Sequence, residues 1–380
     1  MSLIDKSTSL SIKSLSERYN IYLKPPAIIE RELKELEILH SNFVDYTNQR
    51  PITIDGEETR CLDDALYWEK NRDGTYTLYV HITYLPALIR YNSKILEHAM
   101  RQGETIYLED RAISFLPDVI SNNLASLLPG QIRNTLTGIW TIEPNMTIIE
   151  DSFMLKKSII KSQHRLTYDE TDRIIGNKSK DDLGESLYEL GKFALRQKKI
   201  TSKKMLKDGF SSEYVDIDIP DANLLDTSVS ANIIQICMVL YGHSLAKFAQ
   251  DNGLTCINRA CGEQQLFKLN SSLLDDINSN GIDYCSKKLA YYTIETELHS
   301  ALGDIIYGHF SSPARRGSDI MNQFCLEHTY FTQNVSDTIK YEWEDRLRRT
   351  TEHLNNTIPR NNAYARHYNY LKKKELAKKR

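Results

Sequence analysis

Three aspartates and one cysteine lie close together in the segment TIDGEETRCLDDALYWEK, which runs from Thr53 to Lys70. The aspartates are Asp55, Asp63 and Asp64, and the cysteine is Cys61. Carboxylates that converge on one point repel each other unless a cation or a proton lies between them. Because oxygen ligands favour Mg²⁺ or Mn²⁺, the segment predicts a hard-metal site suited to phosphoryl chemistry. From the pattern alone, a surface loop that caps a helix N-terminus is the alternative.

A second segment, YGHFSSPARRGSD from Tyr307 to Asp319, contains small residues and a proline, followed by Arg315 and Arg316. Two planar guanidinium groups after a rigid turn are suited to bidentate phosphate binding. A surface turn that opens a helix would produce the same pattern. Neither segment identifies a function by itself.

Several elements are expected to position these segments. PAIIERELKELEILHSNF predicts a helix after a proline pair, and ITIDG predicts a strand. GTYTLYVHITYL alternates apolar and polar residues after an Asp-Gly turn, which indicates a hairpin. SQHRLTYDETDRIIG contains a capping box, with Thr167 as the cap and Glu170 three residues later. VSANIIQICMVLYGHSLAKFAQDNG predicts a long buried helix that ends at Gly253, and mostly helical structure is expected from Tyr284 onward.

Composition limits the class of protein. Hydrophobic residues make up 41% of the 380 residues and charged residues 26%, so a packed α+β domain is expected. The sequence has no apolar run that suggests a membrane span and no apolar N-terminal stretch typical of a signal peptide, which favours a cytoplasmic protein with no membrane contact. None of the six cysteines forms a CxxC pair, so all except Cys61 are interpreted as reduced packing residues.

The C-terminal segment from Arg346 to Arg380 is rich in lysine and arginine. A solvated helix end is one interpretation. The other is an electrostatic footprint for phosphates, and the interleaved Tyr364, Tyr368 and Tyr370 favour RNA as the ligand.

Four segments resemble, in order and spacing, the RNB catalytic domain of the ribonuclease II and ribonuclease R family of 3′→5′ exoribonucleases. They are TIDGEETRCLDDALYWEKNRDGTYTLYVHIT, GETIYLEDRAISFLPDVISNNLASLLPG, SQHRLTY and HFSSPARRGSD. The resemblance implies a mixed β-sheet core surrounded by helices, with a central RNA channel. It also implies three parts: a helical arm over residues 1–45 without a full cold-shock domain, a catalytic domain over 46–370, and a basic tail over 371–380 without an S1 domain.

The resemblance also implies roles for individual residues. Asp55, Asp63 and Asp64 occupy three of the four positions where the family has metal-binding aspartates, and Cys61 occupies the fourth. The expected catalytic residues are Asp63, Arg315 and Cys61, with Mg²⁺ or Mn²⁺ as the cofactor. A thiol is a poor ligand for Mg²⁺, so the cysteine is expected to weaken a second metal site.

The expected RNA-binding residues are Tyr107, Arg315, Arg316 and Gln235. Tyr107 matches the aromatic residue that stacks on the last base, and Arg315 matches the arginine at the scissile phosphate. Gln235 stands where the family has a glutamate, and Gly317 where it has an aromatic residue.

The favoured prediction is therefore a metal-dependent 3′→5′ exoribonuclease acting on single-stranded RNA with a divergent metal site. One alternative is a catalytically degenerate domain that binds RNA or tRNA 3′ ends, with a protein partner that supplies the missing RNA-binding domains. Another is a domain repurposed for chemistry on an aminoacyl-tRNA 3′ end, with Cys61 as nucleophile or acid/base. Neighbouring carboxylates raise the pKa of a thiol, which argues against that last use of Cys61.

Overall fold

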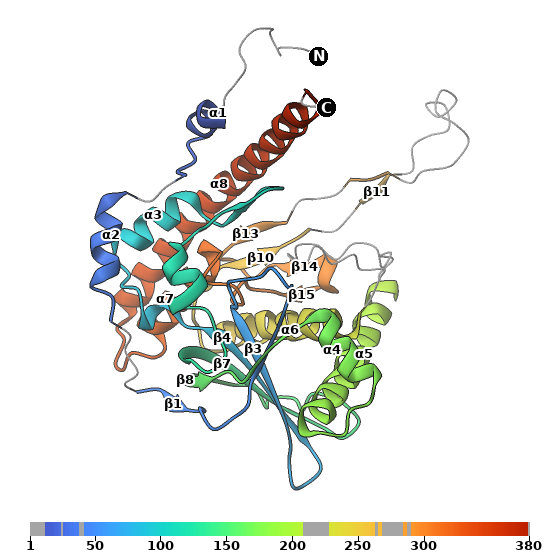
Figure 1. The fold of residues 1–380 in the computed structure, drawn as a ribbon. Coiled ribbons are helices and arrows are strands. Elements are labelled where there is room, and N and C mark those ends of the chain that lie inside the picture. The colour runs from blue at the N-terminus through green and yellow to red at the C-terminus, as the bar shows by residue number, and fades with distance from the viewer. Residues whose placement is uncertain are drawn as a thin grey trace.

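The computed structural model describes residues 12–23, 26–37, 42–207, 228–262, 265–267, 284–286 and 290–378. These residues form a seven-stranded mixed sheet with the strand order β1-β8-β7-β4-β3-β2-β9, surrounded by helices (Figure 1). Strand β1 pairs in parallel with β8, and β2 pairs in parallel with β9, while the other neighbours are antiparallel. The α+β class with a mixed central sheet is confirmed. The strands are β1 (Val44–Asp45), β2 (Ile52–Asp55), β3 (Asp64–Lys70), β4 (Tyr76–Thr83), β7 (Ile132–Ile142), β8 (Met154–Lys161) and β9 (His164–Thr167).

Strand β3 begins at Asp64, which decides between the two interpretations of the acidic segment. The residues after Asp64 form a strand that pairs with β4, so the alternative of a helix cap is wrong. The predicted hairpin is confirmed, with its turn closed between Asn71 and Thr75. Gly74 in this turn has a φ of +88°, a conformation that glycine adopts without steric cost.

One face of the sheet carries the main core. Along β4, the side chains of Leu78, Val80 and Ile82 are fully buried, as expected for alternate residues of a strand that is covered on one face. Helices α4 (Tyr168–Gly176), α5 (Asp182–Lys207) and α6 (Val229–Asp251) lie on this side, and Trp140, Phe193 and Tyr241 join the same cluster. The capping box of Thr167 and Glu170 begins α4 as predicted.

Helix α6 is long and apolar enough, by length and composition, to cross a bilayer. Its apolar side chains instead pack in or against the core, with Ile233, Cys237 and Tyr241 fully buried and Met238 and Leu240 partly buried. This packing accounts for the apolar composition. The helix ends just before Gly253, as the sequence predicts.

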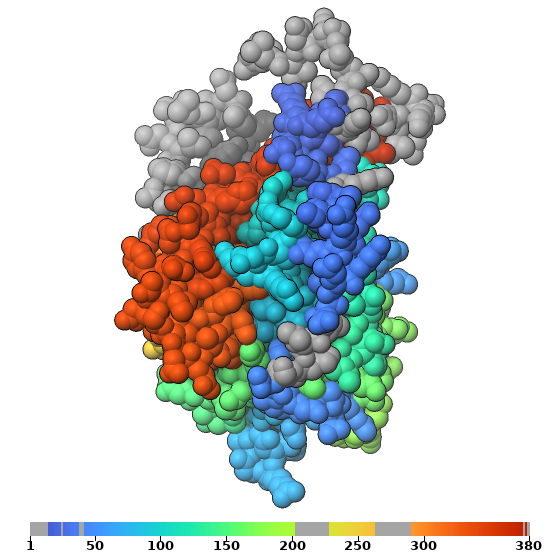
Figure 2. Space-filling model, turned by 90° about the vertical axis from the view of Figure 1, so that its left-hand side faces the viewer, coloured from blue at the N-terminus to red at the C-terminus, as the bar shows by residue number. Residues whose placement is uncertain are grey.

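A second core joins α3 (Lys94–Gln102), α7 (Gly317–Thr329) and α8 (Asp337–Lys378) to the short helices η1 (Leu85–Ala87) and η2 (Ile120–Leu124). Figure 2 shows α2, α3 and α8 side by side on one face, in blue, cyan and orange-red. Helix α7 is almost completely buried. It therefore provides a rigid base for the arginine-containing turn before it.

The expected helical arm consists of two short helices, α1 (Ile12–Arg18) and α2 (Ala27–Lys34). Leu15 of α1 packs in one cluster with Tyr364 and Tyr368 of α8. The carboxylate of Glu32 in α2 accepts hydrogen bonds from the first backbone N–H groups of α3, Lys94 and Ile95. The arm is thus attached to the domain, and residues 38–41 of the predicted helix lie outside the described residues.

The expectation of mostly helical structure from Tyr284 onward is wrong for the first part of that region. The chain forms β12 (Tyr284–Ser286), β13 (Tyr291–Thr293), β14 (Leu298–His299) and β15 (Ile305–Ile306), with η4 (Ser300–Leu302) between the last two, and becomes helical from Gly317. Strand β13 pairs with β10 (Asn258–Ala260), and β12 pairs with β11 (Gln265–Phe267). Strands of two or three residues are too short to show a two-residue period in the sequence.

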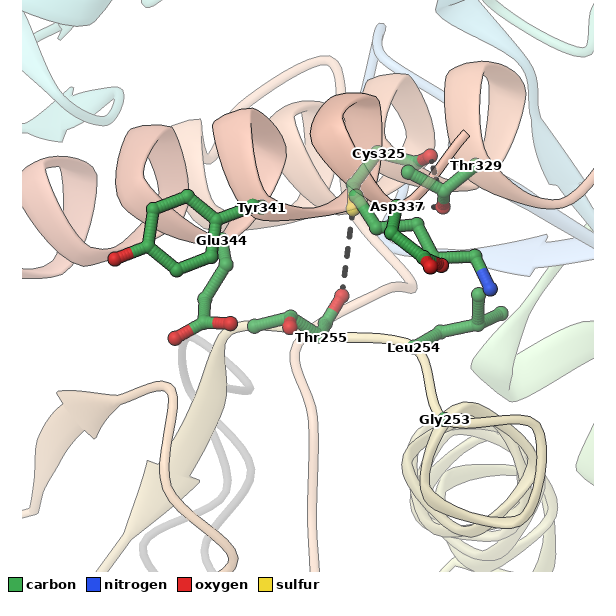
Figure 3. Close-up of a pocket in the computed structure, with 9 residues that line it drawn as sticks. Gly253, Leu254, Thr255, Cys325, Thr329, Asp337, Tyr341 and Glu344 are labelled. Atoms are coloured by element: carbon green, nitrogen blue, oxygen red, sulfur yellow. Dashed lines mark hydrogen bonds between the residues drawn. The ribbon is translucent and has the colours of Figure 1, made fainter. Parts of the chain in front are cut away.

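Four of the five cysteines expected to pack as reduced thiols are free and buried, namely Cys237, Cys256, Cys261 and Cys325. The side chain of Cys285 is not among those described. Figure 3 shows Cys325 beside a cavity of about 200 Å³ between the Gly253–Thr255 turn, α7 and α8. Its thiol lies 3.4 Å from the carbonyl oxygen of Thr255, so it serves the packing of this turn.

Candidate active site

Asp55 and Asp64 are brought together by the sheet. Asp55 is the last residue of β2 and Asp64 the first of β3, and these two strands are antiparallel neighbours. The loop between them therefore returns the chain to the same edge. Burial, followed by the charges of Asp55 and Asp63, raises the pKa of Asp64 well above its usual value.

Both carboxylates hold an oxygen with no partner. Among the described residues, Oδ2 of Asp55 and Oδ2 of Asp64 are buried and make no hydrogen bond. Burial raises the pKa of Asp55 to about 7, the charge of Asp63 adds to this, and Arg165 and Arg315 oppose it. A buried carboxylate without a partner is costly unless a proton or a cation compensates it.

These two oxygens fit a divalent cation with oxygen ligands. In the part of the chain that the structure describes, no group of three or more His, Cys, Asp or Glu side chains is arranged to hold a metal ion. The protein thus offers two carboxylates, and Mg²⁺ or Mn²⁺ bound there would complete its coordination with water or substrate oxygens.

These pKa shifts predict that the metal-free protein loses stability as the pH rises from 5 to 8. The pKa values of Asp55 and Asp63 are raised to about 7 and about 6, so the folded state binds more protons than the unfolded state between about pH 4 and pH 7. The free energy of unfolding therefore falls as these groups ionise. Thermal melts in EDTA should show this fall, and millimolar Mn²⁺ should offset it most strongly at pH 8. A melting temperature that rises from pH 5 to pH 8 in EDTA would contradict the expectation.

Asp63 has a different environment from the other two carboxylates. Its Oδ1 accepts a hydrogen bond from the backbone N–H of Ala314 at 3.2 Å, and its Oδ2 lies 3.7 Å from Nε of Arg315. Burial raises the pKa of Asp63 to about 6, while the charge of Arg315 lowers it. Asp63 therefore joins the acidic loop to the arginine-containing turn before α7.

Cys61 is half-buried and directs its thiol toward Asp63. Its sulfur lies 3.8 Å from Oδ2 of Asp63, in donor geometry. Burial and the charge of Asp63 raise the pKa of this thiol well above its usual value. The side chain is therefore a neutral thiol at neutral pH, which disfavours its use as a nucleophile.

Arg315 and Arg316 point to different surroundings. The Arg315 side chain is 25% exposed and faces Asp63, whereas that of Arg316 is 6% exposed and pairs with Asp319 at 2.9 Å. Arg316 also donates to Oγ of Ser311. The buried ion pair with Asp319 gives Arg316 a role in folding. A role of Arg316 in RNA binding stays a prediction.

This difference predicts stability losses of different size from two matched substitutions. Arg316→Met leaves the buried Asp319 without its cation and should lower the free energy of unfolding by about 3–5 kcal/mol. Arg315→Met should lower the free energy of unfolding by less, because its Nε lies 3.7 Å from Asp63, farther than the 2.9 Å of the Arg316–Asp319 pair, and its side chain is 25% exposed. Urea unfolding of both variants checks the expectation, and equal losses would contradict it.

Gly317, which stands where the family resemblance expects an aromatic residue, is tightly enclosed. A Cβ built there would lie 2.8 Å from the carbonyl oxygen of Gly103 and 3.0 Å from Sδ of Met100. The backbone N–H of Gly317 also donates to that carbonyl at 2.7 Å. The close contact with the end of α3 therefore requires glycine here.

Gly317→Ala is expected to lower the free energy of unfolding by about 1–3 kcal/mol because backbone atoms must shift to accept the methyl group. Gly176→Ala in α4 is the matched control, since nothing lies within 4 Å of its Cβ position. The control should be neutral or slightly stabilising. Denaturant unfolding measures both, and a neutral Gly317 variant would show that α3 and α7 can separate without cost.

Tyr107 and Gln235, the two other predicted RNA contacts, lie on separate elements, and only Tyr107 is shown to lie near the carboxylates. Tyr107 lies in β5 (Ile106–Tyr107), which pairs with β6 (Ala112–Ile113), and is 51% exposed. Burial raises its pKa, and the charges of Arg315 and Asp63 also act on it, so the ring lies near the site. Gln235 is half-buried on α6, two residues before Cys237. Burial and the charge of Asp64 raise the pKa of that thiol.

Two residues near the site were not predicted as functional. Tyr168 begins α4, and burial followed by the charges of Asp64 and Asp55 raises its pKa. Arg165 on β9 interacts with the charge of Asp55. Both belong to the segment SQHRLTY, which resembles a family motif. The motif marks this segment as a candidate for function, but its position in the sequence does not show that it lies near Asp55.

Two histidines near the motifs and the C-terminal segment make contacts that are explained by folding. His81 and His309 are buried, and each Nδ1 contacts a hydroxyl, that of Thr137 or Tyr292. Of the three C-terminal tyrosines, Tyr364 and Tyr368 are buried against the arm and Tyr370 is exposed.

Several basic side chains of α8 form ion pairs, including Lys372 with Asp110 and Lys373 with Glu109. The C-terminal helix therefore offers phosphates less free positive charge than its sequence suggests.

Comparison with known proteins gives the family. The RNB domain profile matches residues 43–332, more than half of the chain. The chain belongs to the RNB domain family. Ribonuclease R 1 from Lactococcus lactis subsp. lactis is 24% identical over 389 residues, covering 90% of this chain and 46% of that protein. Ribonuclease R from Mycoplasmopsis pulmonis is 32% identical over 203 residues, covering 53% of this chain and 26% of that protein. The chain thus spans about half, or less, of the length of these relatives.

Solved structures show the same fold. Mycoplasma genitalium RNase R in complex with ribose-methylated single-stranded RNA superposes with a TM-score of 0.81 at 20% identity, covering 97% of this chain and 64% of that one. Yeast Ssd1, described as a pseudonuclease, superposes with a TM-score of 0.68 at 16% identity, covering 93% and 49%. The fold is therefore shared by proteins described as nucleases and by one described as a pseudonuclease.

Proposed function

We propose that this chain is a divalent-metal-dependent 3′→5′ exoribonuclease that hydrolyses single-stranded RNA. The observation that supports it best is the pair of unpartnered, buried oxygens on Asp55 and Asp64 beside the Asp63–Arg315 contact. A site with free carboxylate oxygens next to a guanidinium group that Asp63 orients can bind both a cation and a phosphate.

Each residue has a defined part in this proposal. Asp55 and Asp64 would hold Mg²⁺ or Mn²⁺, which supplies a polarised water and stabilises charge on the phosphate. Asp63 fixes the direction of Arg315, and the Arg315 guanidinium pairs with the phosphate oxygens. Tyr107 offers an exposed ring on which the last base can stack. The neutral thiol of Cys61 contributes no charge to the site.

The second candidate is a domain that binds RNA 3′ ends without cleaving them. Cys61 in place of a carboxylate favours it, since a hard cation loses an oxygen ligand. The fold is compatible with this use, given its similarity to the Ssd1 pseudonuclease. A tRNA 3′ end is one ligand of this kind, and chemistry on an aminoacyl-tRNA ester is disfavoured by the protonation of Cys61.

Labelled RNA separates the two candidates. A 5′-labelled single-stranded RNA and a circular RNA of the same sequence are incubated with the protein in Mg²⁺, in Mn²⁺ and in EDTA. The nuclease proposal expects a ladder shortened from the 3′ end for the linear RNA, an intact circle, and no products in EDTA. Linear RNA or tRNA that is retained but uncut would support the binder, and cleavage of the circle would contradict 3′-end specificity.

A further inference from the structure

The loop of residues 56–62, which links Asp55 to Asp63 and carries Cys61, is held at its start by one side chain. Nη2 of Arg165 lies 2.6 Å from the carbonyl oxygen of Thr59, 2.9 Å from that of Glu57 and 3.4 Å from that of Gly56. Three carbonyl oxygens of the loop backbone therefore converge on one guanidinium nitrogen. Hydrogen bonds from a charged donor are stronger than those between neutral groups.

The end of the same loop is held by a buried serine. The Ser126 hydroxyl accepts from the N–H of Leu62 and donates to the carbonyl of Arg60, each at 3.0 Å. The carbonyl of Leu62 in turn accepts from the N–H of Leu127 at 3.0 Å. These contacts are deep in the domain, since Ser126 and Leu62 are each 1% exposed. The two ends of the loop thus have separate attachments.

The sheet register places Arg165 where it can act on both the loop and its first ligand. Strand β9 runs parallel to β2, with Arg165 opposite Thr53 and Thr167 opposite Asp55. Arg165 is exposed and held by the loop carbonyls, and its charge also acts on Asp55. It is therefore joined to the site through the loop backbone and not through the core.

We propose that Arg165 is a positioning residue that holds residues 56–59 so that Asp55 and Asp64 can share one cation. The inference rests on the proposed metal-dependent function. Groups that orient metal ligands typically change metal affinity by 10- to 100-fold when they are removed. Loss of the Arg165 contacts frees the start of the loop, while Ser126 still holds its end, so the fold persists but the ligands are less well placed.

Mn²⁺ binding to the RNA-free protein tests this directly. Electron paramagnetic resonance of free Mn²⁺ gives the affinity of the parent chain and of Arg165→Ala, Arg165→Lys and Arg173→Ala. Arg165→Ala should bind about tenfold more weakly, and Arg165→Lys should lose less, because an ammonium group still supplies donors to the carbonyls. Arg173→Ala is the control, an exposed arginine on α4 with a bond from Nε to the carbonyl of Asp169, and it should bind as the parent does.

Hydrogen exchange of the metal-free proteins provides the second readout. The peptide covering residues 56–62 should exchange about fivefold faster or more in Arg165→Ala, while residues 76–83 of β4 stay unchanged. Two results would overturn the positioning role. One is unchanged exchange of the 56–62 peptide in Arg165→Ala, and the other is faster exchange of that peptide while the variant binds Mn²⁺ as tightly as the parent does. A parent chain that binds no Mn²⁺ at millimolar concentration would instead show that the proposed metal-dependent function has failed, and the inference falls with it.

Discussion

Asp64→Asn is expected to abolish RNA hydrolysis while making the metal-free protein more stable. The substitution removes one of the two unpartnered carboxylate oxygens that fit the cation. Metal assistance contributes several kcal/mol to such reactions, so the rate should fall by about a thousandfold or more. The same change removes a buried carboxyl group whose ionised form is disfavoured by burial and by the charges of Asp55 and Asp63, so the free energy of unfolding in EDTA should rise.

The two readouts are measured on the same samples, by single-turnover RNA hydrolysis in Mn²⁺ and by denaturant unfolding in EDTA. Asp251→Asn, at the exposed end of α6, is the control and should change neither. A stable but fully active Asp64 variant would remove the metal from the mechanism. An inactive variant that is also destabilised would mean that Asp64 serves folding instead.

Cys61→Asp is expected to lower the Mg²⁺ concentration needed for half-maximal hydrolysis by about tenfold, because a carboxylate is a far better ligand for Mg²⁺ than a thiol. The thiol already lies 3.8 Å from Oδ2 of Asp63, so a carboxylate at this position stands beside the other acids. The added charge should make the metal-free protein less stable at pH 8.

Cys61→Asn is the matched control, since it has the shape of aspartate without the charge. It should leave the Mg²⁺ requirement near that of the parent. A Cys61→Asp variant with no lower Mg²⁺ requirement would indicate that the site differs from a four-aspartate site by more than one ligand. Equal gains from both variants would assign the effect to size or polarity and not to metal binding.

The sequence was sufficient to predict the sheet around the acidic segment. The alternating pattern of residues 76–83 and the Asp-Gly turn before it are local features, and they placed β4 and its hairpin correctly. The capping box at Thr167 and the end of α6 near Gly253 were predictable for the same reason. In each case the signal and the structure lie within a few neighbouring residues.

Features that depend on distant contacts were not predictable. Arg315 and Arg316 are adjacent in sequence, yet one faces Asp63 and the other is buried with Asp319, a difference set by how α7 packs. The position of Tyr364 and Tyr368 among basic residues favours RNA contacts, but the distant helix α1 covers both side chains. Arg165 contacts a loop more than a hundred residues before it, because β9 pairs with β2.

The most direct test of the central claim is anomalous X-ray scattering from a crystal of the full chain soaked in Mn²⁺. The proposed function requires a Mn²⁺ peak between Asp55 and Asp64, with an oxygen of each carboxylate within about 2.3 Å. The same peak should be absent from an Asp64→Asn crystal treated in the same way. A crystal in which both carboxylates remain without metal, while Mn²⁺ occupies other sites, would contradict the metal-dependent account and leave RNA binding as the function to pursue.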